Sequence, residues 1–259
     1  MIIKREILFT PKEQMRALHI YLPDNYDQTD ERYPVMYFFD GHNLFFDEYA
    51  TYGKSWGLKE FLDQWEKPMI IVGIECGHEG DERLSEYCPY TLKNHKHFGN
   101  IDGIGDQTVQ WMIDELKPMI DRDFRTLPQR ECTAIAGSSM GGLMSLYAVV
   151  CHNDVFSKAA CLSSTVSICQ KALKTEIETA SLSPDTRIYM SWGTDELKRS
   201  KEKPKYNPNS YMARCNRMYA NKLDAKGVVT RLYCQNGGQH CEADWEKQNE
   251  KYMNFLWME

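Results

Sequence analysis

Short runs of residues that are apolar on both faces of an extended chain limit the fold of this sequence more than any other feature. Residues 34–39 (Pro-Val-Met-Tyr-Phe-Phe) and 69–74 (Met-Ile-Ile-Val-Gly-Ile) are the clearest examples. Side chains alternate between the two faces of a strand, so a strand without polar positions must be covered on both sides, as in parallel sheets flanked by helices. Similar runs occur at residues 6–10, 18–22, 133–136, 159–162, 187–192 and 228–233.

Segments with apolar residues at helical spacing separate these runs. They cover residues 55–65, with Ser55 as a candidate N-cap, and residues 109–120, 141–150, 210–225 and 244–257. Regular alternation of strands and helices predicts an α/β fold with a mostly parallel central sheet and helices on both faces. No repeat or linker interrupts the series, so residues 1–259 are expected to form a single domain.

Two polar segments do not follow this alternation. Residues 77–105 carry five glycines and are expected to form a long loop over one end of the sheet. Residues 197–209 are basic and contain proline, which predicts a second loop.

Charge and hydropathy exclude several classes of protein. The chain has 31 basic and 37 acidic residues, a formal net charge of -6, and its lysines and arginines are scattered. This distribution argues against a nucleic-acid partner. No apolar run approaches the roughly 20 residues that a membrane-spanning helix needs. A soluble globular enzyme or small-ligand binder remains, and the sequence does not indicate its oligomeric state.

The number and spacing of the cysteines indicate the redox state of the cellular compartment. Nine are present, an odd number, and no two form a C-x-x-C pair. Buried free thiols in a reducing compartment explain this usage better than a disulfide framework. The first residues lack the pattern of a signal peptide, so a cytoplasmic location is expected, although a secreted protein trimmed of its signal would look the same.

A serine motif follows the run at 133–136. Gly137-Ser138-Ser139-Met140-Gly141 matches G-x-S-x-G, and an apolar helical segment comes next. A nucleophilic serine in this context occupies a strained turn between strand and helix, where glycines two residues away on each side avoid collisions. The motif therefore indicates Ser139 as a nucleophile. The alternative is a tight glycine turn whose serines only cap the helix.

A nucleophilic serine needs a base and an orienting acid, in the chain order serine, acid, histidine. Of the seven histidines, only His152 and His240 follow Ser139; His152 ends the helix that begins at the serine, where a cation suits the helix C-terminus. His240 lies in a glycine-rich loop after the last strand and is the predicted base. Glu196, three residues after Gly193, is the favoured acid, with Asp195 as the alternative.

Backbone N–H groups are the expected donors of an oxyanion hole. One is the N–H of Met140, the residue after the nucleophile. The other is expected in the loop after the strand at 34–39, and the N–H of His42 is the candidate.

With these motifs the chain resembles the putative-esterase branch of the α/β-hydrolases, which includes S-formylglutathione hydrolase (esterase D), feruloyl and acetylxylan esterases, enterochelin esterases and mycolyltransferases. The matching segments span nearly the whole chain: residues 39–45, 55–57, 83–89, 137–142, 193–196 and 238–242. The resemblance implies an α/β-hydrolase fold, a serine carboxylesterase activity, no cofactor, and a pocket roofed by residues 77–105.

Members of this branch cleave thioesters, sugar acetates, cinnamoyl esters and siderophore lactones. Without an export signal, a small-molecule ester is the expected substrate, such as an acetyl or cinnamoyl ester of a sugar or related metabolite. An acyltransferase or an S-formylglutathione-type thioesterase would use the same triad. A non-catalytic ligand-binding protein of this fold is the alternative of another class.

Several weaker signals concern the pocket. Phe45 and Trp56, with other aromatic residues between them, could line an acyl pocket beside Gly41 or could simply pack beneath the loop. Arg83 is expected to pair with Glu86, three residues later, with contact to substrate as the alternative. His95 and His97 could ligate a metal, but no partner ligand shows suitable spacing, so a solvated loop is favoured and no metal is expected.

Overall fold

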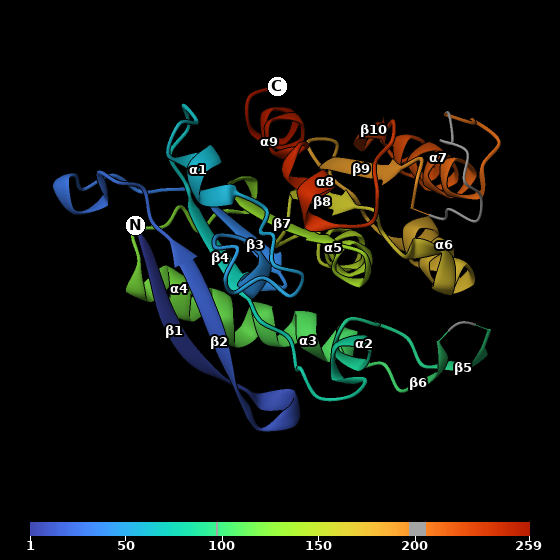
Figure 1. Cartoon of the computed structure of the whole chain (residues 1–259), viewed down its shortest axis with the longest axis horizontal. Helices are drawn as coiled ribbons and strands as arrows, with labels where there is room; N and C mark the ends of the chain where they lie inside the picture. The colour runs from blue at the N-terminus through green and yellow to red at the C-terminus, as the bar shows by residue number, and fades with distance from the viewer. Residues whose placement is uncertain (97, 197–205) are drawn as a thin grey trace.

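The computed structural model describes residues 1–96, 98–196 and 206–259. Its centre is an eight-stranded sheet in the order β1-β2-β4-β3-β7-β8-β9-β10 (Figure 1). The strands are β1 (Ile2–Phe9), β2 (Gln14–Tyr21), β3 (Val35–Phe39), β4 (Ile70–Ile74), β7 (Thr133–Ser138), β8 (Lys158–Leu162), β9 (Arg187–Gly193) and β10 (Val229–Gln235). All eight predicted strands are present.

The direction of the strands confirms the predicted mostly parallel sheet. From β4 to β10 every neighbouring pair is parallel, whereas β1 and β2 form an antiparallel hairpin that joins the sheet through antiparallel pairing of β2 with β4. The carboxyl ends of six strands therefore meet along one edge of the sheet, where polar side chains from distant parts of the chain can converge.

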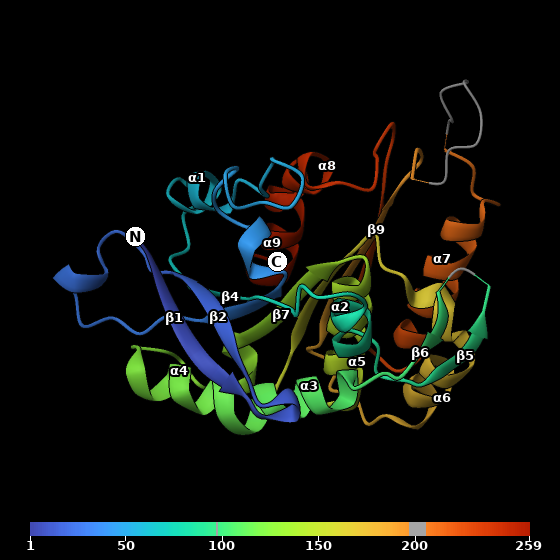
Figure 2. The ribbon, with the colours of Figure 1, turned by 60° about the horizontal axis from the view of Figure 1, so that its bottom comes forward.

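Helices cover both faces, as the two-sided apolar runs require. Tyr37 and Val72 point into a core closed by α3 (Gly105–Trp111), α4 (Lys117–Asp123), α5 (Met140–Cys151), α6 (Gln170–Thr179) and α7 (Tyr211–Asp224). Phe38 and Ile71 point into a second core beneath α1 (Leu58–Leu62), α8 (Glu242–Glu246) and α9 (Asn249–Trp257). Figure 2 shows these two layers, with α1, α8 and α9 above the sheet and α3, α4 and α5 below it.

The helices depart from expectation in several places. Helix α6 was not predicted, and α3 continues through a π-helical turn (Met112–Leu116) into α4, so this helical stretch is longer at both ends than 109–120. The predicted helix 55–65 shrinks to α1, because Gly57 has left-handed backbone angles and the Ser55 hydroxyl bonds to Asp47 instead of capping a helix. The last helix is divided into α8 and α9.

Residues 77–105 are more ordered than a plain loop. They hold the short helix α2 (Glu82–Glu86) and a hairpin of β5 (Leu92–His95) and β6 (Gly99–Ile101). Most of the predicted loop 197–209 lies outside the described residues. The nine cysteines are free and are buried or half-buried. None of the helices in the described part of the chain has the length and apolar character that crossing a bilayer requires.

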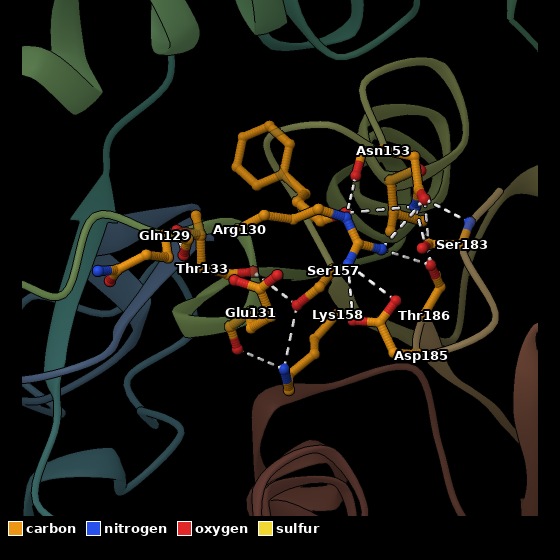
Figure 3. A network of polar contacts seen from close by, with 12 residues as sticks. Gln129, Arg130, Glu131, Thr133, Asn153, Ser157, Lys158, Ser183, Asp185 and Thr186 are labelled. Atoms are coloured by element: carbon orange, nitrogen blue, oxygen red, sulfur yellow. Dashed lines mark hydrogen bonds and ion pairs between the residues drawn. The ribbon is translucent and has the colours of Figure 1, made fainter. Parts of the chain in front are cut away.

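A polar network joins three strands at their amino ends, opposite the carboxyl edge (Figure 3). Arg130, just before β7, makes two hydrogen bonds of 2.9 and 2.7 Å to the Asp185 carboxylate. Its other nitrogens donate to Thr186, to the side chain of Asn153 and to the Asn153 carbonyl oxygen. The Lys158 ammonium donates to the carbonyl oxygen of Glu131. One arginine thus fixes the segments that lead into β7, β8 and β9.

We expect Arg130→Ala to lower the free energy of unfolding by about 2 kcal/mol, since it leaves acceptors on the buried Asn153 and Thr186 without this donor. Urea denaturation would measure this change. The matched control is Arg231→Ala, which removes an equally short but exposed pair with Glu259 and should have a much smaller effect. Equal losses in the two variants would contradict the structural role of the network.

Candidate active site

Ser139 occupies the turn between β7 and α5 in a strained conformation. Its φ of 57° and ψ of -119° are unusual for a residue with a side chain. A Cβ added to Gly137 would lie 2.7 Å from the carbonyl carbon of Gly141, and one added to Gly141 would lie 2.9 Å from the Cβ of Phe39. Close packing therefore requires both glycines of the motif, as predicted from their positions on each side of Ser139.

Hydrogen bonds hold this turn against the next strand. The Ser139 N–H donates to the Leu162 carbonyl oxygen at 3.0 Å, and the Ser139 carbonyl oxygen accepts from the N–H of Thr165 at 3.0 Å. The surrounding backbone thus stabilises a conformation that the isolated turn would not keep.

The two backbone N–H groups predicted as oxyanion donors have no acceptor within their own helices. The first bond of α5 runs from Leu143 N–H to Ser139 oxygen, so the Met140 N–H has no acceptor within the helix. His42 lies in a 3₁₀ helix (Gly41–Asn43) whose first bond joins Asn43 N–H to Asp40 oxygen, which leaves the His42 N–H without a helical acceptor too. Neither N–H group is therefore used by a hydrogen bond within its helix.

His240 faces Glu196. The His240 Nδ1 lies 3.3 Å from Glu196 Oε2, and the Glu196 side chain is only 4% exposed. Of the two carboxylates that the sequence left as alternatives, Glu196 is the one in contact with His240. Asp195 is anchored differently, with its N–H bonded to the Gly238 oxygen at 2.9 Å.

The other oxygen of Glu196 is held by two donors. The hydroxyl of Ser163 donates at 2.6 Å and the N–H of Gly193 at 2.5 Å, both to Oε1. The indole N–H of Trp245 in turn donates to the Ser163 hydroxyl at 2.8 Å, and the Trp245 ring packs edge-on against His240. The sequence does not indicate Ser163 and Trp245, because their roles depend on contacts between residues 33 and 82 positions apart.

Ser139 and His240 open into one pocket of about 360 Å³. The pocket lies at the carboxyl edge of the sheet, and its walls are mostly polar. The residues that line it are Asp40, His42, Asn43, Thr51, Tyr52, Cys76, Gly77, His78, Gly80, Arg83, Ser138, Ser139, His240, Glu242 and Trp245. Glu242 is buried, and burial raises the pKa of its carboxyl above the usual range.

Arg83 pairs with Asp40, so its predicted pairing with Glu86 is wrong. Two hydrogen bonds of 2.7 Å join the guanidinium to the carboxylate. Burial alone would raise the pKa of Asp40, but the charge and hydrogen bonds of Arg83 outweigh it and hold this pKa below its usual value. Glu86 instead accepts from Arg16 at 2.8 Å and from the Gly77 N–H at 2.9 Å. Helical spacing cannot reveal Asp40 as the partner of Arg83 or Arg16 as the partner of Glu86. Asp40 and Arg16 both belong to other segments of the chain.

The other predicted pocket residues lie beneath the surface. Phe45 and Trp56 are buried in the core under α1, α8 and α9, which favours the packing alternative. Trp56 packs against Trp245 and so supports the pocket wall from behind. Gly41 packs against the backbone of β4, since a Cβ there would lie 2.4 Å from the carbonyl carbon of Gly73.

Two groups of side chains have the chemical types of metal ligands. Of the predicted candidates, His95 lies on β5 and His97 is outside the described residues. A different set is close together, because ligand atoms of His42, Glu75 and His78 lie within 4.8 Å of one another. These are nitrogen and oxygen ligands of types that zinc accepts.

Replacing Arg83 by methionine would leave the Asp40 carboxylate buried without its counter-charge. We expect Arg83→Met to lower the free energy of unfolding by about 2–3 kcal/mol, as measured by urea denaturation. Asp40→Asn in the same chain should recover part of this loss, because it removes the unpaired charge. If the losses in free energy of unfolding caused by Arg83→Met and Asp40→Asn simply added up in the double variant, a direct ion pair would be contradicted.

Comparisons with known proteins agree with this architecture. A family model described as "Putative esterase" matches residues 11–255. The uncharacterized protein YbbA of Bacillus subtilis is 24% identical over 247 residues, which cover 93% of this chain and 92% of YbbA. An endo-1,4-beta-xylanase/feruloyl esterase of Xylanibacter ruminicola is 29% identical over 157 residues, 58% of this chain but only 20% of that enzyme.

A solved structure shares the fold. The enterobactin esterase of Shigella flexneri, crystallised in the presence of enterobactin, superposes with a TM-score of 0.73 at 17% identity. The match covers 100% of this chain and 59% of the esterase chain. The mostly parallel sheet with helices on both faces is thus an α/β-hydrolase fold.

Proposed function

The chain belongs to the Putative esterase family and is a carboxylic ester hydrolase, and from this premise we propose that it cleaves small acyl esters through an acyl-enzyme on Ser139. The observation that carries the proposal is the contact of His240 with the buried Glu196 at the pocket that also contains the strained Ser139. A nucleophile, a base and an orienting acid then occupy the roles of a hydrolytic triad.

The proposed reaction has two acyl-transfer steps. His240 takes the proton of Ser139 as the serine oxygen attacks the ester carbonyl, and the N–H groups of Met140 and His42 stabilise the oxyanion. Glu196 orients the imidazole and stabilises its positive charge. The alcohol leaves with the proton from His240, and water then attacks the acyl-enzyme by the same route.

The role of Ser139 is tested with Ser139→Ala. We expect kcat for p-nitrophenyl acetate to fall at least 10³-fold, since the acyl-enzyme can no longer form. Mass spectrometry after treatment with a fluorophosphonate should find the label on the peptide that contains Ser139 and no label in the variant. Activity within tenfold of the unmodified enzyme would exclude this nucleophile.

Glu196 and Asp195 form a matched pair of tests. Glu196→Gln keeps the shape of the side chain but loses the negative charge beside His240, so kcat should fall 10²-fold or more. Asp195→Asn should change kcat by only a few fold, because its side chain is not the one in contact with His240. The reverse order of effects would assign the orienting acid to Asp195.

The pocket supports a short acyl group with polar substituents. Its volume of about 360 Å³ is small, and its walls carry the Asp40–Arg83 pair, Glu242 and the aromatic Trp245. The relative from Xylanibacter ruminicola is named for feruloyl esterase activity, and the Shigella flexneri structure for enterobactin. We therefore infer an acetyl or hydroxylated aromatic ester as substrate.

A panel of esters tests this inference. We expect kcat/KM for p-nitrophenyl acetate or methyl ferulate to exceed that for p-nitrophenyl decanoate at least tenfold, since a long alkyl chain does not fit a small polar pocket. S-formylglutathione in the same panel measures thioester cleavage. A preference for the decanoate would refute the assignment of the substrate class.

A further inference from the structure

Three ligand-type side chains meet beside the catalytic pocket. His42 follows β3, and Glu75 and His78 follow β4. Because β3 and β4 are neighbouring parallel strands, their carboxyl ends bring these residues to the same place. His42 and His78 also line the pocket that contains Ser139, and their rings pack edge to face with centroids 4.9 Å apart.

Hydrogen bonds around His42 define which of its ring nitrogens is free to accept. The N–H and the hydroxyl of Thr51 both donate to Asn43 Oδ1, at 2.8 and 3.1 Å. The single proton of that hydroxyl is thereby used, so at the 3.0 Å contact with His42 Nε2 the hydroxyl can only accept. Donation from the hydroxyl to Asn43 Oδ1 fits the tautomer of His42 with its proton on Nε2, and in that tautomer Nδ1 has a bare lone pair.

This lone pair is buried without a partner. His42 Nδ1 is sealed from solvent, and no hydrogen-bond partner for it exists among the described residues. A buried acceptor left unpaired is unfavourable unless something binds it, and neutral imidazole is the form that ligates metals.

Glu75 is oriented in the way that a metal-ligating carboxylate usually is. The buried His19 lies 2.5 Å from Glu75 Oε1 through its Nε2 and holds this side of the carboxylate. The other oxygen, Oε2, lies 3.2 Å from His78 Nε2. Ligands bound at 2.0–2.2 Å in a tetrahedral zinc site are roughly 3.3 Å apart, so this pair already has suitable spacing.

We propose that His42, Glu75 and His78 form a zinc site on the wall of the pocket. One ligand atom from each of the three residues lies within 4.8 Å of the other two, and His78, whose side chain is 57% exposed, can rotate toward a shared ion. Two imidazoles and one carboxylate leave the fourth tetrahedral position for water or a ligand oxygen from the pocket. Within the described residues this is the one such cluster.

Direct zinc binding tests the proposal independently of esterase activity. The tag-free full chain, stripped with a chelator and kept reduced, would compete with a chromophoric zinc indicator. We expect one equivalent of zinc to bind with micromolar or tighter affinity. His78→Ala and Glu75→Gln should each weaken binding at least tenfold, since each removes or neutralises a ligand.

Control variants separate this site from other zinc ligands. His152→Gln, at the end of α5 away from the cluster, should bind zinc as the parent chain does. Circular dichroism of His78→Ala should match the parent spectrum, as expected for an exposed residue. Failure of the parent chain to bind zinc, or unchanged affinity in His78→Ala because cysteines hold the metal, would overturn the proposal.

Discussion

The close approach of two backbone segments at Gly193 and Gly238 is the contact on which the candidate site depends. A Cβ at Gly193 would lie 2.1 Å from the Gly238 carbonyl oxygen, so no other residue can occupy this position without separating the segments. One segment carries Glu196 and the other His240. Their contact therefore rests on steric complementarity of the backbone as well as on the attraction between carboxylate and imidazole.

Burial of charge imposes a second requirement at the same edge of the sheet. Glu196 and Asp40 are nearly inaccessible to water, and a buried carboxylate is tolerated only with donors or a counter-charge. Glu196 receives a hydroxyl and a backbone N–H, whereas Asp40 receives a bidentate guanidinium. The first arrangement leaves one oxygen free to face His240, and the second leaves Asp40 fully engaged. The two carboxylates thus differ in what they can offer a substrate or a neighbouring base.

Much of this arrangement was predictable because it is local in the sequence. Short apolar runs identified all eight sheet strands, and the turn around Ser139 could be recognised from its two glycines between an apolar strand and an apolar helix. The partners of Arg83 and Glu86 could not be recognised in the sequence, because they lie 43 and 70 residues away. Helical spacing instead suggested that Arg83 and Glu86 pair with each other. Ser163 has a positive φ of 46° and no motif to mark it. Helix α6 and the β5–β6 hairpin were missed for a similar reason, because their apolar positions are few and pack against elements distant in sequence.

The position of the Arg130 network bears on how this enzyme could be altered. Arg130 joins the amino ends of β7, β8 and β9, whereas Ser139, Glu196 and His240 lie at the carboxyl edge. A full strand length therefore separates a major polar anchor of the scaffold from the pocket walls. Selection for new ester specificity can act on residues such as Tyr52 or Glu242 without loosening that anchor. Libraries confined to such pocket-wall positions, with Gly193, Gly238 and the Asp40–Arg83 pair kept, should consequently yield a high proportion of folded variants.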